Sequence, residues 1–236
     1  MKALFRNNLQ WHVFYHAWSN QGQVTGDRLG LALSAAMAEE FRAAIQALFG
    51  STNMADQQRA NQWLTAFCAT PEAWEACIGL LNNSMPVTVL FFAANALLVK
   101  SRGDWSKLDS NQRAQLSATI GDKMLQLVQT GVDALVVKRL CMVLSAMAAR
   151  SGPEAVGGLA TQAQALAGAA QGPGQLLAAL AMLEAVAQES CELDSSRAAA
   201  NMHGLLPACS AVLALLQQGA GLPALLPSAA CRPGVG

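Results

Sequence analysis

The chain has 236 residues, of which 53% are hydrophobic and only 13% are charged, a composition that excludes a disordered chain and favours a folded protein with a substantial core. Its 15 lysine and arginine residues are balanced by 15 aspartate and glutamate residues, which argues against direct binding of nucleic acid through bulk positive charge. No apolar run reaches the ~20 residues of a transmembrane helix, so we predict no membrane insertion.

Apolar residues recur at helical spacing from near Ala35 almost to the end of the chain. Residues 1–34 have weak periodicity and are expected to form an N-terminal extension, whereas residues 219–236 are broken by proline and glycine and are expected to form an irregular tail. No stretch alternates with the period of a strand. The pattern predicts helices over 35–50, 55–69, 71–81, 86–102, 109–129, 132–150, 155–170, 174–190 and 201–218.

Three short motifs predict where helices begin. Thr70 precedes Pro71 and is expected to cap the helix that follows, with the proline in its first turn. Asp109 and Gln112 have the spacing of a capping box, and Ser151 and Glu154 have the same spacing.

The helix predicted after Pro86 is apolar on nearly every side. Such a helix must be covered by neighbours on several sides, so we expect it to lie in the middle of a larger helical array. Asn95, Lys100 and Arg102 are its candidates for an exposed edge that meets a partner. One face carries Val87, Leu90, Phe91, Ala94, Leu97 and Leu98, and the other carries Phe92, Ala93, Ala96 and Val99.

Breakers divide the helices into pairs that start near residues 37, 71, 109, 153 and 201. These steps bracket the period of helix-pair repeats, in which each pair buries one face against its predecessor and one against its successor. The sequence therefore predicts an all-α fold, a HEAT-like superhelix (solenoid) of four to five helix pairs over residues 35–218.

Four segments in this order resemble the N-terminal part of the importin-β superfamily, and most closely its transportin 3 and importin 13 branch. The similarity extends over residues 37–216. The family's R-A-x-x-W-L, A-W-x-x-x-x-x-L-L and F-A-A-x-x-L/M-x-x-K patterns are matched in turn. The segments are RANQWL (59–64), PEAWEACIGLL (71–81), VLFFAANALLVKSRGDWSKL (89–108) and VVKRLCMVLSAMAARSG (136–152).

The resemblance implies a HEAT-repeat nuclear transport receptor that shuttles between nucleus and cytoplasm and needs no cofactor. Its implied partners are the small GTPase Ran in the GTP form, protein cargo such as SR-type or other nuclear proteins, and nucleoporins. In this family Ran docks on the inner helices of the first repeats, which here correspond to 55–69, 86–102, 132–150 and 174–190. We therefore predict Gln62, Asn95, Lys100 and Arg139 as contacts for Ran.

The sequence departs from the family in two respects. Residues 1–34 have no counterpart in the resemblance, and the helical pattern stops after about four and a half repeats, where family members continue through many more. We therefore expect the sequence to be a fragment or an incomplete gene model, which would place a cargo site outside it.

The alternative to a transport receptor is a HEAT or armadillo scaffold that joins proteins outside nuclear transport. An enzyme is not expected, because the sequence lacks GxSxG, HExxH, P-loop and GxGxxG motifs, and repeats separate Cys68 and Cys141 from His203. His12 and His16 have the spacing of a metal pair on a helix but lack a third ligand, so no metal site is predicted. Trp63 and Trp74 lie on apolar stripes and are expected to pack in the core.

Overall fold

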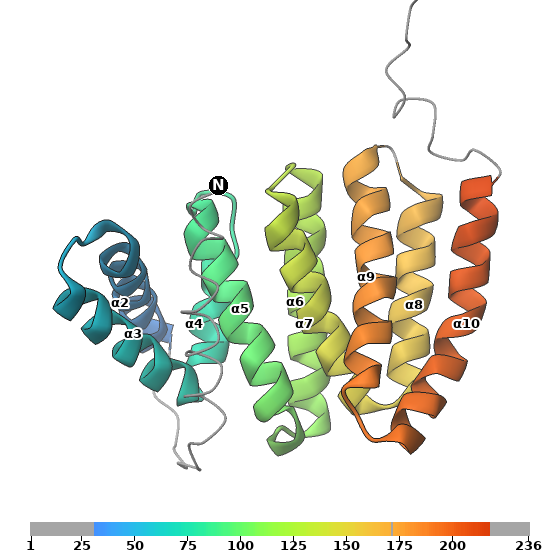
Figure 1. Ribbon diagram of the computed structural model, residues 1–236, viewed down its shortest axis with the longest axis horizontal. Helices are drawn as coiled ribbons and strands as arrows, with labels where there is room; N and C mark the ends of the chain where they lie inside the picture. Colours follow the sequence, from blue (N-terminus) through green and yellow to red (C-terminus); the bar gives the residue numbers. More distant parts are fainter. Residues whose placement is uncertain (1–30, 171, 218–236) are drawn as a thin grey trace, which may run out of the picture.

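The computed structural model describes residues 31–170 and 172–217, and within these ranges it contains helices and short turns and no strand. The predicted extension and tail therefore lie almost entirely outside the described residues. Figure 1 shows the helices standing side by side in one elongated row. Their bounds are α2 Leu31–Gly50, α3 Met54–Ala69, α4 Ala73–Leu80, α5 Val87–Gly103, the 3₁₀ turn η1 Trp105–Lys107, α6 Ser110–Gln129, α7 Ala134–Ser151, α8 Pro153–Gly168, α9 Pro173–Cys191 and α10 Ser195–Gln217.

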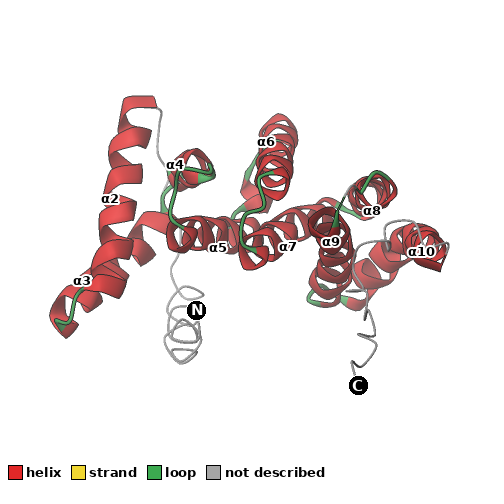
Figure 2. Cartoon of the chain, turned by 90° about the horizontal axis from the view of Figure 1, so that it is seen from above, coloured by secondary structure: helices red, strands yellow, loops and turns green. Residues whose placement is uncertain are grey.

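Successive helices pair, and the pairs stack. α2 packs on α3, α4 on α5, α6 on α7 and α8 on α9, while α7 is flanked by α5 and α9. Figure 2 shows α5, α7 and α9 forming one layer of the row and α4, α6 and α8 the other, with α10 at the end against α8 and α9. The predicted all-α solenoid is confirmed. We call the surface that α5, α7 and α9 turn away from α4, α6 and α8 the α5–α7–α9 face.

α5 is the covered middle helix that its two-sided apolarity predicts. Every residue from Phe92 to Ser101 is buried, a stretch of almost three helical turns, so no side of the helix in that stretch is open to water. α4 and α7 supply most of this cover, and α2 and α3 contribute at the edge. α5 thus joins the first repeats to the later ones through a continuous apolar core.

Two tryptophans anchor the second repeat to the third. Trp74 is buried, as predicted, and its ring lies 6.4 Å from that of Trp105. Trp105 falls in a segment whose sequence indicates a loop, but η1 turns its side chain into the core, where Nε1 donates a hydrogen bond to Ser151 Oγ at 2.9 Å. Trp63 is only half-buried and stacks on Phe67 with ring centroids 5.1 Å apart.

The structure contains one of the three predicted capping motifs and contradicts the other two. The capping box of Asp109 and Gln112 is present with both hydrogen bonds. The prediction for Thr70 is wrong, because this residue closes α3, its backbone N–H bonding to Phe67 O, and α4 begins only at Ala73.

The box predicted for Ser151 and Glu154 is also wrong. Ser151 is the last residue of α7, and its hydroxyl donates to Met147 O within that helix. The final helix starts earlier than predicted, at Ser195 rather than residue 201, because the Asp194 carboxylate accepts hydrogen bonds from Ser196 Oγ and Arg197 N and so caps it.

Gly152 makes the turn between α7 and α8, and its backbone has φ 118° and ψ 179°, which is open in practice to glycine alone. We expect Gly152→Ala to lower the free energy of unfolding by about 1–3 kcal/mol through backbone strain, since no atom lies within 4 Å of the added Cβ position. The control is Gly157→Ala inside α8, which also meets no neighbour within 4 Å and should raise stability by roughly 0.5–1 kcal/mol. Urea denaturation measures both, and equal effects of the two variants would contradict the strain at Gly152.

Candidate partner-binding surface

The four predicted contact residues occupy different environments. Gln62 is exposed on α3, Asn95 is 8% exposed on α5, and Arg139 is half-buried on α7. Lys100 is only 1% exposed, so its side chain does not reach the surface from which a partner would approach.

Lys100 instead ties α5 to the end of α3. Its ammonium donates hydrogen bonds to Cys68 O at 3.2 Å and Thr70 O at 2.8 Å, and to Asp104 Oδ2 at 2.9 Å. It also lies 5.5 Å from the centroid of a Trp74 ring, within the range of a cation–π contact. The ammonium satisfies carbonyls that the end of a helix leaves without intrahelical donors, so Lys100 joins neighbouring repeats.

The Asp104 carboxylate completes this junction. Burial alone would raise its pKa, but hydrogen bonds from Lys107 and Lys100 outweigh burial and hold the pKa below its ordinary value. Asp104 is therefore ionised at neutral pH and balances the buried Lys100 charge.

The buried thiols are unreactive at neutral pH. Burial raises the pKa of Cys68 to about 12 and that of Cys141 to about 12, and it also raises the pKa of Cys77. A thiolate is the reactive form of cysteine, so at neutral pH these three side chains pack as small apolar groups rather than act as nucleophiles.

Arg139 is held against α5. Its guanidinium carbon lies 5.1 Å from the centroid of the Phe91 ring. Asn95 is one helical turn beyond Phe91 and therefore lies on the same side of α5. The structure thus brings two of the predicted residues, the half-buried Arg139 and the buried Asn95, to neighbouring positions where α7 packs on α5, whereas Gln62 stands apart on α3.

A buried acidic residue that the sequence analysis missed lies beside this region. Glu189 on α9 is 0% exposed, and its carboxylate accepts a hydrogen bond from Arg102 Nε at 3.2 Å and another from Arg150 Nη1 at 3.4 Å. The three side chains therefore join α5, α7 and α9 in one ionic cluster. The sequence contains a signal for this cluster, because Arg102, Arg150 and Glu189 each lie in the last turn of the second helix of a pair, in three successive pairs.

The surroundings of Arg139 disfavour the positive charge of its guanidinium. Burial lowers the pKa of its guanidinium, the positive charge of Arg102 lowers it further, and Glu189 opposes both effects. Arg139 remains charged, because the pKa of arginine lies far above neutral pH.

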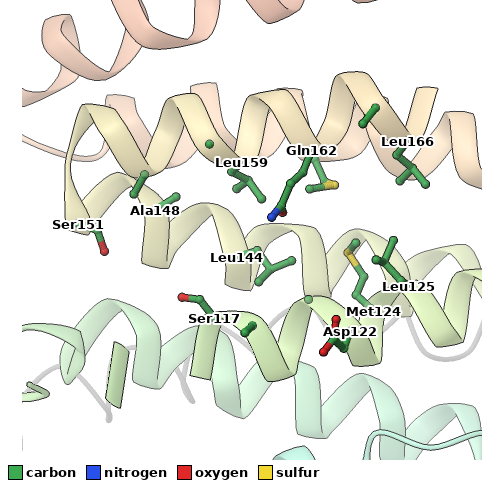
Figure 3. Close-up of a pocket in the computed structure, with 16 residues that line it drawn as sticks. Ser117, Asp122, Met124, Leu125, Leu144, Ala148, Ser151, Leu159, Gln162 and Leu166 are labelled. Carbon is green, nitrogen blue, oxygen red and sulfur yellow. The ribbon is translucent and has the colours of Figure 1, made fainter. Parts of the chain in front are cut away.

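A groove opens on the other layer, where α6 and α8 lie on either side of α7 (Figure 3). Its volume is about 640 Å³. Leu144 and Ala148 form the floor, and Ser117 and Asp122 of α6 stand across from Gln162 of α8. The lining is mainly apolar, which suits contact with apolar side chains rather than acid–base chemistry.

The described helices offer no metal centre and no membrane span. In residues 31–170 and 172–217, no group of three or more His, Cys, Asp and Glu side chains could hold a metal ion, and the pair His12 and His16 lies outside these ranges. Among the same residues no helix combines the length and apolarity needed to cross a bilayer.

Comparison with known proteins agrees with the resemblance that the four sequence segments carry. No family model matches the chain. The chain is 26% identical over 186 residues to Importin-13 from Pongo abelii, Homo sapiens and Bos taurus. The aligned region covers 76% of this chain and 19% of each relative, so the chain spans about a fifth of their length. Over three quarters of its sequence, this row of paired helices is thus similar to importin-13.

Proposed function

We propose that the chain is part of a nuclear transport receptor of the importin-β superfamily, on the transportin 3 and importin 13 branch, and that it binds the small GTPase Ran in its GTP form. The similarity to importin-13 over 76% of the chain carries this proposal. The stacked helix pairs support it, because a solenoid offers the extended surface that a protein partner needs. The receptor would work by binding and would shuttle between nucleus and cytoplasm with protein cargo.

The proposed mechanism is coupling between two ligands. If Ran-GTP and cargo favour different curvatures of the solenoid, binding of either one lowers the affinity for the other. Buried links between repeats, such as Lys100 with the end of α3 and Glu189 with Arg102, make neighbouring repeats move together. Docking of Ran on α3, α5, α7 and α9 would then be transmitted along the row to a cargo site.

The proposed contact residues are now Gln62 and Arg139. Gln62 is exposed, and Arg139 is half-buried beside Phe91. Lys100 leaves this set because its ammonium is engaged inside the protein, and Asn95 leaves it because its side chain is buried. A Lys100→Glu variant would disrupt the fold and would not report on a contact.

Binding of the full chain to Ran loaded with GDP or with a non-hydrolysable GTP analogue tests the proposal. Isothermal titration calorimetry should show at least a tenfold preference for the GTP form, or about 1.4 kcal/mol. Arg139→Glu should weaken that binding, whereas Arg197→Glu, an exposed arginine on α10, should leave it unchanged. Equal binding to both nucleotide forms, or to neither, would reject the transport proposal and favour the scaffold alternative.

A further inference from the structure

The groove between α6 and α8, which we call the α6–α8 groove, separates two helices of the same layer. Both helices pack on α7 but form no packed pair with each other, whereas α8 packs closely on α10. A Cβ added at Gly204 of α10 would lie 3.1 Å from Pro153 O of α8, so these two helices almost touch. A Cβ added at Gly121 of α6 or Gly158 of α8, both in the groove lining, would meet no atom within 4 Å. α6 and α8 therefore leave open space between them.

This groove leaves apolar surface open to water. Leu144 and Ala148 form its floor, and Leu159 and Leu166 line the wall on α8. Leu125, on the wall that α6 forms, keeps 39% of its surface exposed. Removing apolar surface from water is the main driving force of association, so the groove suits apolar side chains of a ligand.

Asp122 gives the α6–α8 groove a negative charge. Of the described residues that line the groove, Asp122 alone is charged, and it is exposed. None of the ion pairs within residues 31–170 and 172–217 includes its carboxylate. Charge at the rim of an interface adds little affinity but selects the sign of the partner. The lining therefore favours an apolar ligand that carries a basic group.

We propose that the α6–α8 groove binds an amphipathic helix of a protein partner, with apolar side chains on the floor and one lysine or arginine beside Asp122. An extended peptide fits less well, because its backbone N–H and C=O groups need hydrogen-bond partners that a mainly apolar lining does not supply. A helix satisfies these groups internally and presents only side chains to the groove.

The length of the groove fits two to three turns of such a helix. Its lining runs from Ser117 to Leu125 on α6 and from Ala155 to Leu166 on α8, which corresponds to about 12 Å and about 16 Å along these helices. Apolar anchors at positions i, i+4 and i+7 of the bound helix span about 10 Å and so fall within it. The site lies on the layer opposite the α5–α7–α9 face, and it is independent of the proposed binding of Ran.

Fluorescence anisotropy with the full chain tests the proposal. The probe is a labelled sixteen-residue peptide of alanine, leucine and lysine whose leucines form one stripe at helical spacing. It should bind at least tenfold more tightly than a peptide of the same composition whose leucines are spread around the helix. Gly158→Leu places a side chain in the groove and should lower the affinity at least tenfold, without the cost of a glycine inside a helix. Thr161→Leu, at an exposed position of α8 outside the lining, is the matched control and should change the affinity less than twofold.

A second pair of variants tests the charge. The lysine peptide should bind more tightly than the same peptide with glutamate in place of lysine, and Asp122→Lys should reverse that order. Glu192→Lys changes the net charge of the chain equally at an exposed position outside the lining, and it should leave the order intact. Circular dichroism should show the same helix content for all variants.

Equal binding of the striped and spread peptides would overturn the proposal, as would an unchanged affinity of Gly158→Leu or an unchanged order of the two charged peptides with Asp122→Lys. Sedimentation velocity covers the other occupant. Self-association of the chain that Gly158→Leu abolishes would identify a second copy in the groove instead of a partner helix. Because no GTPase is present in these measurements, failure here would leave the proposed binding of Ran to its own test.

Discussion

Replacing Lys100 with methionine is expected to lower the free energy of unfolding by about 3 kcal/mol, the cost of breaking a buried ion pair. Methionine fills a similar volume but donates no hydrogen bond. The carbonyls of Cys68 and Thr70 then lose a donor in the core, and Asp104 loses its buried counter-charge. Urea denaturation followed by circular dichroism measures the change.

Lys107→Met is the matched control for this variant. Lys107 binds the other oxygen of the same Asp104 carboxylate at 2.8 Å, but its side chain is 54% exposed. An exposed ion pair contributes little, so this variant should change stability by no more than about 0.5–1 kcal/mol. If both lysine variants had the same small effect, Lys100 would not be the link between α3 and α5.

Replacing Glu189 with glutamine is expected to cost about 2–4 kcal/mol of unfolding free energy. The variant keeps the shape of the side chain and removes the only negative charge that Arg102 and Arg150 share in the described cluster. These arginines, on α5 and α7, would then lose the carboxylate that they share. Because the cluster joins three helices, we expect unfolding also to become less cooperative, with a lower slope against denaturant concentration.

Glu184→Gln on the same helix is the control for Glu189. Glu184 is 60% exposed and pairs with Lys138, which is 50% exposed, so its loss should change stability by less than about 1 kcal/mol. Comparable destabilisation by the two variants would show that the buried cluster does not hold α5, α7 and α9 together.

The positions of the helices and the stacking of the pairs follow from the sequence because they depend on periodicity. The apolar residues of α5 surround the helix, and the structure buries every residue from Phe92 to Ser101. Helix ends are harder to predict, because one residue can serve either neighbour. Thr70 stands between two helices and closes the first rather than opening the second. At Ser151, the positive φ of Gly152 turns the chain so sharply that α8 begins at once without a side-chain cap.

The candidate site was harder to predict than the fold, because its contacts join residues far apart in the sequence. The carbonyl of Thr70 that binds Lys100 comes from another helix pair, 30 residues away. Glu189 meets Arg102 across 87 residues. A lysine near a helix end looks the same in sequence whether it points to solvent or to a neighbouring repeat. Only the packing of α3 against α5 distinguishes these two cases.

The central claim is that the α5–α7–α9 face binds Ran in its GTP form. Hydrogen exchange of the full chain, measured alone and with Ran loaded with either GDP or the GTP analogue, tests it most directly. We expect the GTP form to slow exchange in α3, α5, α7 and α9 while α4, α6 and α8 stay unchanged, and the GDP form to have no effect. Protection confined to α4, α6 and α8, or equal protection by both nucleotide forms, would contradict the account.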